Sequence, residues 1–177
     1  MSRSVLLGLL LAVLLFWATG AYNRLMRLRS GSIAAFASLE AVLSQYLPLV
    51  QMHQAQSPGS ADATQAAWAS LSAAAQQFHI SLKVAQAQPL NAPTISALRT
   101  AHETLCVSWT RLQALPPDPS GPVLPPALQT QWQQITAQAE LARTEFNQRL
   151  LQYNRAINHF PARLLAWLFD FKPAPSV

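Results

Sequence analysis

The chain has 177 residues, of which 51% are hydrophobic and only 11% are charged, and its net charge is +5. This length accommodates one ordinary domain and an appendage, and the charged fraction is far below the roughly 25% of an average soluble domain. The basic residues form no run interleaved with aromatic side chains and no groove-reading motif, so nucleic acid is not an expected partner.

A hydrophobic segment near the N-terminus accounts for part of this composition. No charged residue lies between Arg3 and Arg24, and residues 5–21 have the sequence VLLGLLLAVLLFWATGA. A run of about 17 such residues is at the lower limit for spanning a bilayer and is longer than the core of a cleaved signal peptide. We therefore predict that residues 1–21 are a transmembrane anchor.

The residues that follow bear on whether this segment is cleaved. Ala18-Thr19-Gly20 is a small-x-small triplet, so cleavage as a signal peptide is the alternative. Residues 21–28, AYNRLMRL, contain neither glycine nor proline and connect the hydrophobic run to the next helical pattern. Because an unbroken helix that enters a folded domain is a poor protease site, we predict that the anchor is retained.

Proline-rich segments divide the remaining chain into parts with helical patterning. The breaks are Pro58-Gly59-Ser60, residues 89–93 and the linker 116–126, which contains six prolines. Proline removes a helix hydrogen bond and clashes with the preceding turn, so helices are expected to end there. Pro48 is the one proline inside a helical pattern, where it predicts a kink or an early helix end.

Between these breaks, apolar residues recur at spacings of three and four, as in amphipathic helices, and no segment shows the period-2 alternation of a strand. The four predicted core stripes are Leu25, Leu28, Ala35, Leu39, Val42, Tyr46 and Leu49, with Ser32 in the one gap; Trp68, Leu71, Ala75, Phe78, Leu82 and Ala85; Ile95, Leu98, His102, Leu105, Trp109 and Leu112; and Leu128, Trp132, Ile135, Ala139, Ala142, Phe146, Leu150, Tyr153, Ile157 and Phe160.

The predicted fold is all-α: an N-terminal transmembrane helix continues into an antiparallel four-helix bundle with a short C-terminal helix. The predicted helices span residues 5–52, 62–88, 93–115 and 126–160, with the short helix near 161–169. Pro161 suits the start of that helix because proline is tolerated in a first helical turn. Residues 22–173 form the bundle domain and residues 174–177 a tail.

Two blocks of sequence lie at the ends of this domain. Residues 22–50 are YNRLMRLRSGSIAAFASLEAVLSQYLPLV, and residues 142–173 are ARTEFNQRLLQYNRAINHFPARLLAWLFDFKP. Both resemble the LemA family, whose members open with Tyr-Asn and an arginine-rich first turn. The closing motifs of the family correspond to Arg143 with Phe146-Asn147, Tyr153-Asn154, Phe160-Pro161 and Phe171-Lys172-Pro173.

Two departures from the family pattern accompany this resemblance. Asp170 stands where the family has glycine, and the proline-rich middle region lacks the usual Glu-x-Tyr-Pro stretch. The resemblance implies a membrane-attached bundle of long antiparallel helices and brings no catalytic residues with it. A membrane-shaping or scaffolding role has been suggested for some relatives, and many resemble lipoproteins with a cysteine before Tyr-Asn, where this chain has Gly20-Ala21.

The sequence offers little for catalysis. None of the four glutamates is followed three residues later by histidine, as a di-metal site in a bundle requires. His102 and Cys106 share a helix face and could begin a metal site or pair a thiolate with a base. The simpler interpretation is a buried histidine with one backbone partner and a small core cysteine. We expect no enzyme activity, no metal or cofactor, and no small-molecule substrate.

The C-terminal part of the sequence contains a row of asparagines and a strongly apolar segment. Asn147, Asn154 and Asn158 form a polar row beside the last apolar stripe, and buried amides need partners. We predict that they bond to the first helix near Asn23 and Arg24 and set its register; the alternative is a recognition groove for a partner peptide. Residues 162–171, ARLLAWLFDF, either cap the core or lie in the membrane interface.

An up-down-up-down topology places the end of the last helix beside the start of the bundle part of the first. The two family blocks would then form one membrane-proximal site with basic residues at headgroup level, serving structure or membrane docking. Its predicted members are Tyr22, Asn23, Arg24, Arg27, Arg29, Asn147, Tyr153, Asn154, Arg155, Phe160, Pro161, Arg163, Trp167, Phe169, Phe171 and Lys172.

These features favour a non-enzymatic scaffold or adaptor in the bacterial inner membrane, with protein partners or self-association. The alternative is a membrane-remodelling or lipid-surface-binding protein. The lipoprotein-like relatives favour an extracytoplasmic bundle. The alternative is a cytoplasmic bundle. The positive-inside rule favours it, because more arginines follow the anchor (Arg24, Arg27 and Arg29) than precede it (Arg3).

Overall fold

A computed structural model of the chain describes residues 3–54, 62–116, 124–158 and 173–176. Within these ranges there is no strand, so the all-α prediction is confirmed. The short helix predicted near 161–169 lies outside the described residues. The helices are α1, Arg3–Leu43; α2, Tyr46–Gln54; α3, Asp62–Ala87; α4, Ala92–Gln113; and α5, Pro126–Asn158.

The predicted first helix, residues 5–52, is two helices because of Pro48. A continuous helix would bring the Pro48 ring against the carbonyl of Ser44, four residues earlier. The chain instead makes a turn at Ser44 and Gln45, where the Gln45 amide donates to the Val42 carbonyl at 3.1 Å. Pro48 then lies in the first turn of α2, where no helical partner exists for its missing N–H. The early helix end is therefore confirmed, one turn before the proline.

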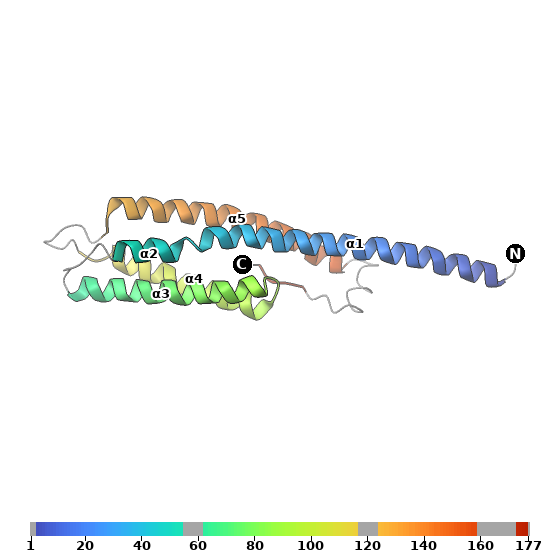
Figure 1. Cartoon of the computed structure of the whole chain (residues 1–177), viewed down its shortest axis with the longest axis horizontal. Helices are drawn as coiled ribbons and strands as arrows, with labels where there is room; N and C mark the ends of the chain where they lie inside the picture. The colour runs from blue at the N-terminus through green and yellow to red at the C-terminus, as the bar shows by residue number, and fades with distance from the viewer. Residues whose placement is uncertain (1–2, 55–61, 117–123, 159–172, 177) are drawn as a thin grey trace.

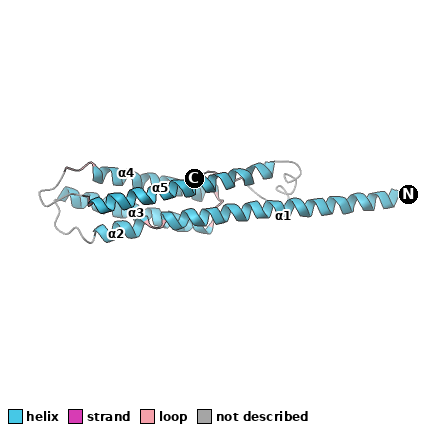
Figure 2. Cartoon of the chain, turned by 90° about the horizontal axis from the view of Figure 1, so that it is seen from above, coloured by secondary structure: helices cyan, strands magenta, loops and turns pink. Residues whose placement is uncertain are grey.

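The N-terminal part of α1 extends far beyond the other helices (Figures 1 and 2). The large apolar side chains that the structure describes there are exposed, among them Leu9 at 63% and Phe16 at 85%. The stretch between Arg3 and Arg24 is about 30 Å long at 1.5 Å per residue, which matches the hydrocarbon thickness of a bilayer. Among the described residues, this N-terminal helix is long and apolar enough to cross a membrane. The predicted continuity across residues 21–28 is confirmed.

The bundle has the predicted antiparallel topology. The chain runs outward along α1 and α2, returns along α3, runs outward again along α4 and returns along α5 (Figure 1). The most extensive contacts join α1 to α5 and α3 to α4, while α2 packs on α3 and α5. One ion pair, between Lys83 Nζ and Glu40 Oε1 at 3.7 Å, links α3 to α1.

The four predicted stripes form the core. All of their described members are buried except Leu28, Val42, His102 and Ala142, which are partly buried. Ser32 fills the gap in the first stripe at 0% exposure, and its hydroxyl donates to the Leu28 carbonyl at 3.1 Å. The stripes omitted Phe36, which is 2% exposed and packs edge-on against Phe146 at 5.4 Å.

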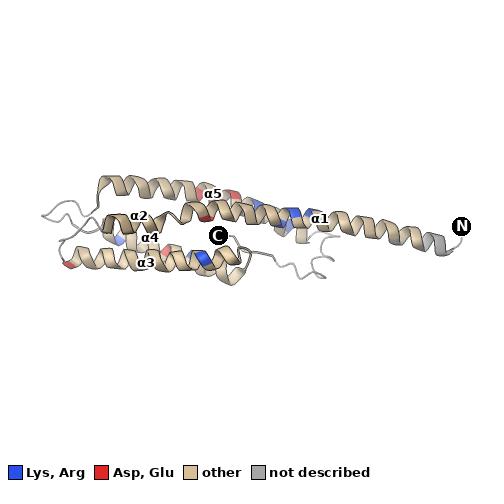
Figure 3. Cartoon of the chain, in the orientation of Figure 1, with Lys and Arg blue, Asp and Glu red and all other residues tan. Residues whose placement is uncertain are grey.

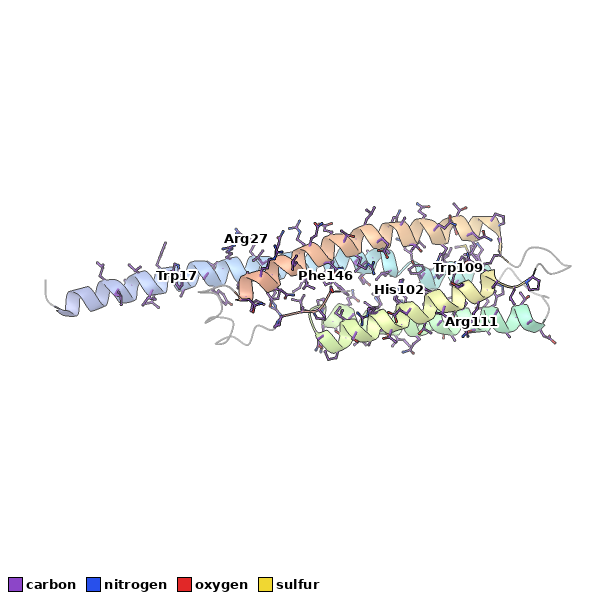
Figure 4. All side chains as sticks on the ribbon, turned by 180° about the vertical axis from the view of Figure 1, so that it is seen from behind. Trp17, Arg27, His102, Trp109, Arg111 and Phe146 are labelled. Atoms are coloured by element: carbon purple, nitrogen blue, oxygen red, sulfur yellow. The ribbon has the colours of Figure 1, made fainter. Side chains whose placement is uncertain are left out.

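Five rings from α2, α3, α4 and α5 form a continuous set of aromatic contacts inside the bundle, and we call them the aromatic layer: Tyr46, Phe78, His102, Trp109 and Trp132. Trp109 of α4 and Trp132 of α5 stack with centroids 4.1 Å apart, and Trp132 lies 4.7 Å from Tyr46 of α2. Figure 4 shows His102 and Trp109 between the helices. The layer therefore spans the boundary between α4 and α5.

Candidate membrane-proximal site

Residues from distant parts of the sequence meet at the end of the bundle from which the exposed part of α1 projects (Figure 1). Of the predicted site, Asn23, Arg24, Arg27, Arg29 and Arg155 are exposed, Tyr22, Asn147 and Asn154 are partly buried, and Tyr153 is buried. The other predicted members lie outside the described residues: Phe160, Pro161, Arg163, Trp167, Phe169, Phe171 and Lys172.

Tyr153 and Arg29 connect the two ends of the sequence. Tyr153 is 2% exposed near the end of α5, and both residues line the same cleft. Burial raises the pKa of Tyr153, and the positive charge of Arg29 partly opposes this rise. The end of α5 therefore lies beside the arginine-rich part of α1, as the topology predicted.

Asn154 binds the C-terminal segment through both ends of its amide. Its Nδ2 donates to the Ala174 carbonyl at 2.7 Å, and the Ala174 backbone N–H donates to its Oδ1 at 3.1 Å. Ala174 itself is only 4% exposed. One side chain thus satisfies both backbone groups of a residue twenty positions later in the chain.

This arrangement corrects the prediction for Asn154 and Asn158, two of the three asparagines of the predicted row. Asn154 bonds to Ala174, and Asn158 Nδ2 donates to the Asn154 carbonyl of its own helix at 3.0 Å. Neither bond reaches Asn23 or Arg24, which are exposed to water and need no protein partner. The side-chain amide of Asn154 instead bonds to the backbone of Ala174, which supplies both a donor N–H and an acceptor carbonyl.

A cleft of about 750 Å³ opens beside Tyr153. Arg29 and Ile33 of α1 and Tyr153 of α5 line it, together with residues 86–93 around the turn between α3 and α4. Pro173, the residue before the Ala174 that Asn154 binds, completes the described lining. Sequence reasoning missed this cleft. The prolines of the turn indicated a helix boundary but not that the turn faces Arg29.

Positive charge is concentrated at this end of the bundle. Figure 3 shows the basic residues of α1 and those of the last turns of α5 close together, with the acidic residues of both helices farther along the bundle. Arg149 is paired with Glu145 at 3.5 Å. Among the described residues, no carboxylate lies within ion-pair distance of Arg24, Arg27, Arg29 or Arg155. Figure 4 shows Arg27 directed away from the bundle.

The His102 and Cys106 pair lies far from this end, in and beside the aromatic layer. Their Nε2 and Sγ atoms are 3.9 Å apart, and both side chains are half-buried. His102 therefore contacts the sulfur of Cys106 and not the backbone partner that was predicted for it. Cys106 is partly exposed, whereas it was predicted to be a core residue. The described residues hold no group of three potential metal ligands. Burial lowers the pKa of His102, and Arg143 lowers it further.

The Cys106 thiol is expected to react slowly. Burial raises its pKa, and the carboxylates of Glu103 and Glu140 raise it further, so the nucleophilic thiolate is scarce at neutral pH. Labelling with a chromogenic disulfide at pH 7.5 is expected to be about tenfold slower, or more, than in denaturant, and to accelerate as the pH rises. Equal rates in the folded and denatured chains would contradict this assignment.

The geometry defines an all-α bundle carried on one N-terminal apolar helix of membrane-spanning length. The model of the LemA family matches residues 125–177, which contain α5 and the segment that Asn154 clamps. This match, which covers less than half of the chain, confirms the resemblance of the second sequence block to the LemA family; the first block lies outside the matched residues. No curated protein and no solved structure matches the chain.

Proposed function

We propose that this protein is a non-enzymatic scaffold or adaptor of the bacterial cell envelope, anchored in the membrane by α1. The observation that carries the proposal is the continuity of α1 from Arg3 to Leu43. The same helix supplies the exposed apolar segment and, through Leu25, Phe36 and Leu39, part of the core. The bundle is therefore joined rigidly to its membrane segment instead of through a flexible linker.

A continuous α1 would hold the far end of the bundle at a fixed distance from the membrane. From Arg24 to Gln54 the chain rises about 45 Å at 1.5 Å per residue, allowing for one break. The far end consists of α2, the start of α3, the end of α4 and the start of α5, and few charged residues lie there (Figure 3). A neutral, glutamine-rich surface of this kind suits contacts with other envelope proteins more than with anionic lipid.

Site-specific photocrosslinking in intact cells tests the scaffold. A photoreactive residue at Met52, which is 55% exposed on α2, is expected to give discrete protein adducts that co-purify with the full chain. The same residue at Arg27 is the matched control near the membrane and is expected to yield fewer protein adducts. Absence of protein adducts at both positions would contradict the scaffold.

The second candidate function is binding or remodelling of the lipid surface. It is favoured by the exposed arginines Arg24, Arg27 and Arg29, which directly follow the apolar part of α1. Deformation of liposomes by the purified chain, without crosslinked partners, would favour this function over the scaffold.

The proposed location of the bundle is extracytoplasmic, as in the lipoprotein-like relatives. The test is a fusion, after Val177, to a reporter that functions only in the periplasm. We expect this fusion to show reporter activity. An inactive periplasmic reporter together with an active cytoplasmic one would place the bundle on the cytoplasmic side, in line with the positive-inside rule.

A further inference from the structure

We propose that the cleft between Arg29 and Tyr153 binds the phosphate of an anionic phospholipid headgroup. This inference rests on the membrane anchoring in the proposed function, but not on the identity of any protein partner. It assigns the cleft at Arg29 a specific ligand, whereas the second candidate function requires only attraction between the exposed arginines and the charge of the lipid surface.

The lining of the cleft favours an anion. Arg29 is the one charged residue among its described lining residues, and no carboxylate is present there to pair with it. A guanidinium presents two parallel N–H donors that match the geometry of phosphate oxygens. Ile33, Leu90 and the prolines of the lining supply apolar surface for the glycerol and the first acyl carbons.

Tyr153 provides the second, independent observation. The residue is 2% exposed, lines the cleft, and its hydroxyl has no hydrogen-bond partner among the described residues. A ligand oxygen in the cleft would accept a hydrogen bond from this hydroxyl, which remains protonated because burial raises the pKa of Tyr153.

The start of α4 forms part of the wall of the same cleft. Asn91 is the N-cap residue, but its side chain makes no cap hydrogen bond and its Nδ2 donates to Gln88 Oε1 at 2.7 Å. Asn91, Ala92 and Pro93 line the cleft, and because Pro93 has no N–H, Ala92 is the α4 residue of the lining that has a backbone N–H without a side-chain cap. The positive end of the helix dipole favours an anion at this position.

The height of the cleft identifies the source of phosphate. Arg29 is about 7–8 Å farther along α1 than Arg24, where the uncharged segment ends. The headgroup layer on each side of a bilayer is about 5–8 Å thick. When α1 spans the hydrocarbon core, Arg29 therefore lies at the level of the headgroups, where lipid phosphate is abundant.

Titration of the full-length chain in neutral detergent tests the proposal. The probes are a short-chain phosphatidylglycerol, a phosphatidylcholine of the same chain length, and inorganic phosphate, with binding measured by calorimetry. Phosphatidylglycerol is expected to bind most tightly, because the choline ammonium is repelled by Arg29. Arg29→Gln is expected to weaken its binding about tenfold or more, and Tyr153→Phe several-fold.

Arg27→Gln is the matched control, because it removes the same charge from an exposed position on α1 outside the cleft. It is expected to change the affinity less than twofold. Equal losses in Arg27→Gln and Arg29→Gln, or no binding of phosphatidylglycerol, would overturn the proposal. Equal binding of inorganic phosphate would overturn lipid as the ligand. Photocrosslinking from Met52 should be unchanged in Arg29→Gln, which separates this test from that of the scaffold.

Discussion

Replacing Trp132 by alanine is expected to lower the free energy of unfolding of the bundle by about 3–5 kcal/mol, the range for buried aromatic truncations. Trp132 is 6% exposed, stacks on Trp109 with ring planes 3° apart, and contacts Tyr46. The substitution removes contacts of α5 with both α2 and α4 and leaves a cavity in the aromatic layer. Because the backbones of α4 and α5 approach less closely than those of α1 and α5, few other contacts can compensate.

Denaturant titration of the full chain in detergent, followed by helical circular dichroism, measures this change. Leu141→Ala is the matched control: it truncates a large apolar residue of the same helix at a position that is 75% exposed. It is expected to change the free energy of unfolding by less than about 0.5 kcal/mol. Similar losses for the two variants would mean that the aromatic layer is not part of the core.

The helices and the core could be predicted from sequence because they depend on local periodicity. The spacing of three and four identifies the buried face of each helix whatever it packs against, so Leu71 and Leu105, both 0% exposed, were assigned correctly. Pro48 likewise acts on its own preceding turn, which is why its effect could be foreseen and appears at Ser44. Short connections then fix the antiparallel order.

The candidate site could be predicted only in part, because it depends on contacts between distant residues. The topology placed the end of α5 beside the start of the bundle part of α1, but the sequence shows only that Asn154 needs a partner and not that Ala174 supplies it. The orientation of the turn between α3 and α4, and hence the cleft, depends on how four helices pack together. Cys106 was assigned to the core because it lies beside Leu105, although adjacent helical positions point about 100° apart.

Replacing Asn154 by alanine is expected to release the C-terminal segment from the bundle. The change removes both hydrogen bonds to Ala174 and leaves the N–H and the carbonyl of a residue that is 4% exposed without partners. Unpaired buried backbone groups cost about 1–3 kcal/mol, so the segment should detach to reach water. Hydrogen exchange of the Ala174 amide is then expected to accelerate about 10- to 100-fold.

Amide exchange measured by mass spectrometry on the C-terminal peptide tests this expectation, with Asn158→Ala as the control. Asn158 is an exposed asparagine of the same helix, and its side chain bonds only to the carbonyl of Asn154. Its loss should leave the exchange of Ala174 unchanged, since water can replace an exposed bond. Protection of Ala174 that persists in Asn154→Ala would show that apolar packing, and not the amide clamp, holds the segment. If the clamp does hold it, the same variant also displaces Pro173 from the wall of the cleft, so phosphatidylglycerol binding should weaken with Arg29 and Tyr153 both intact.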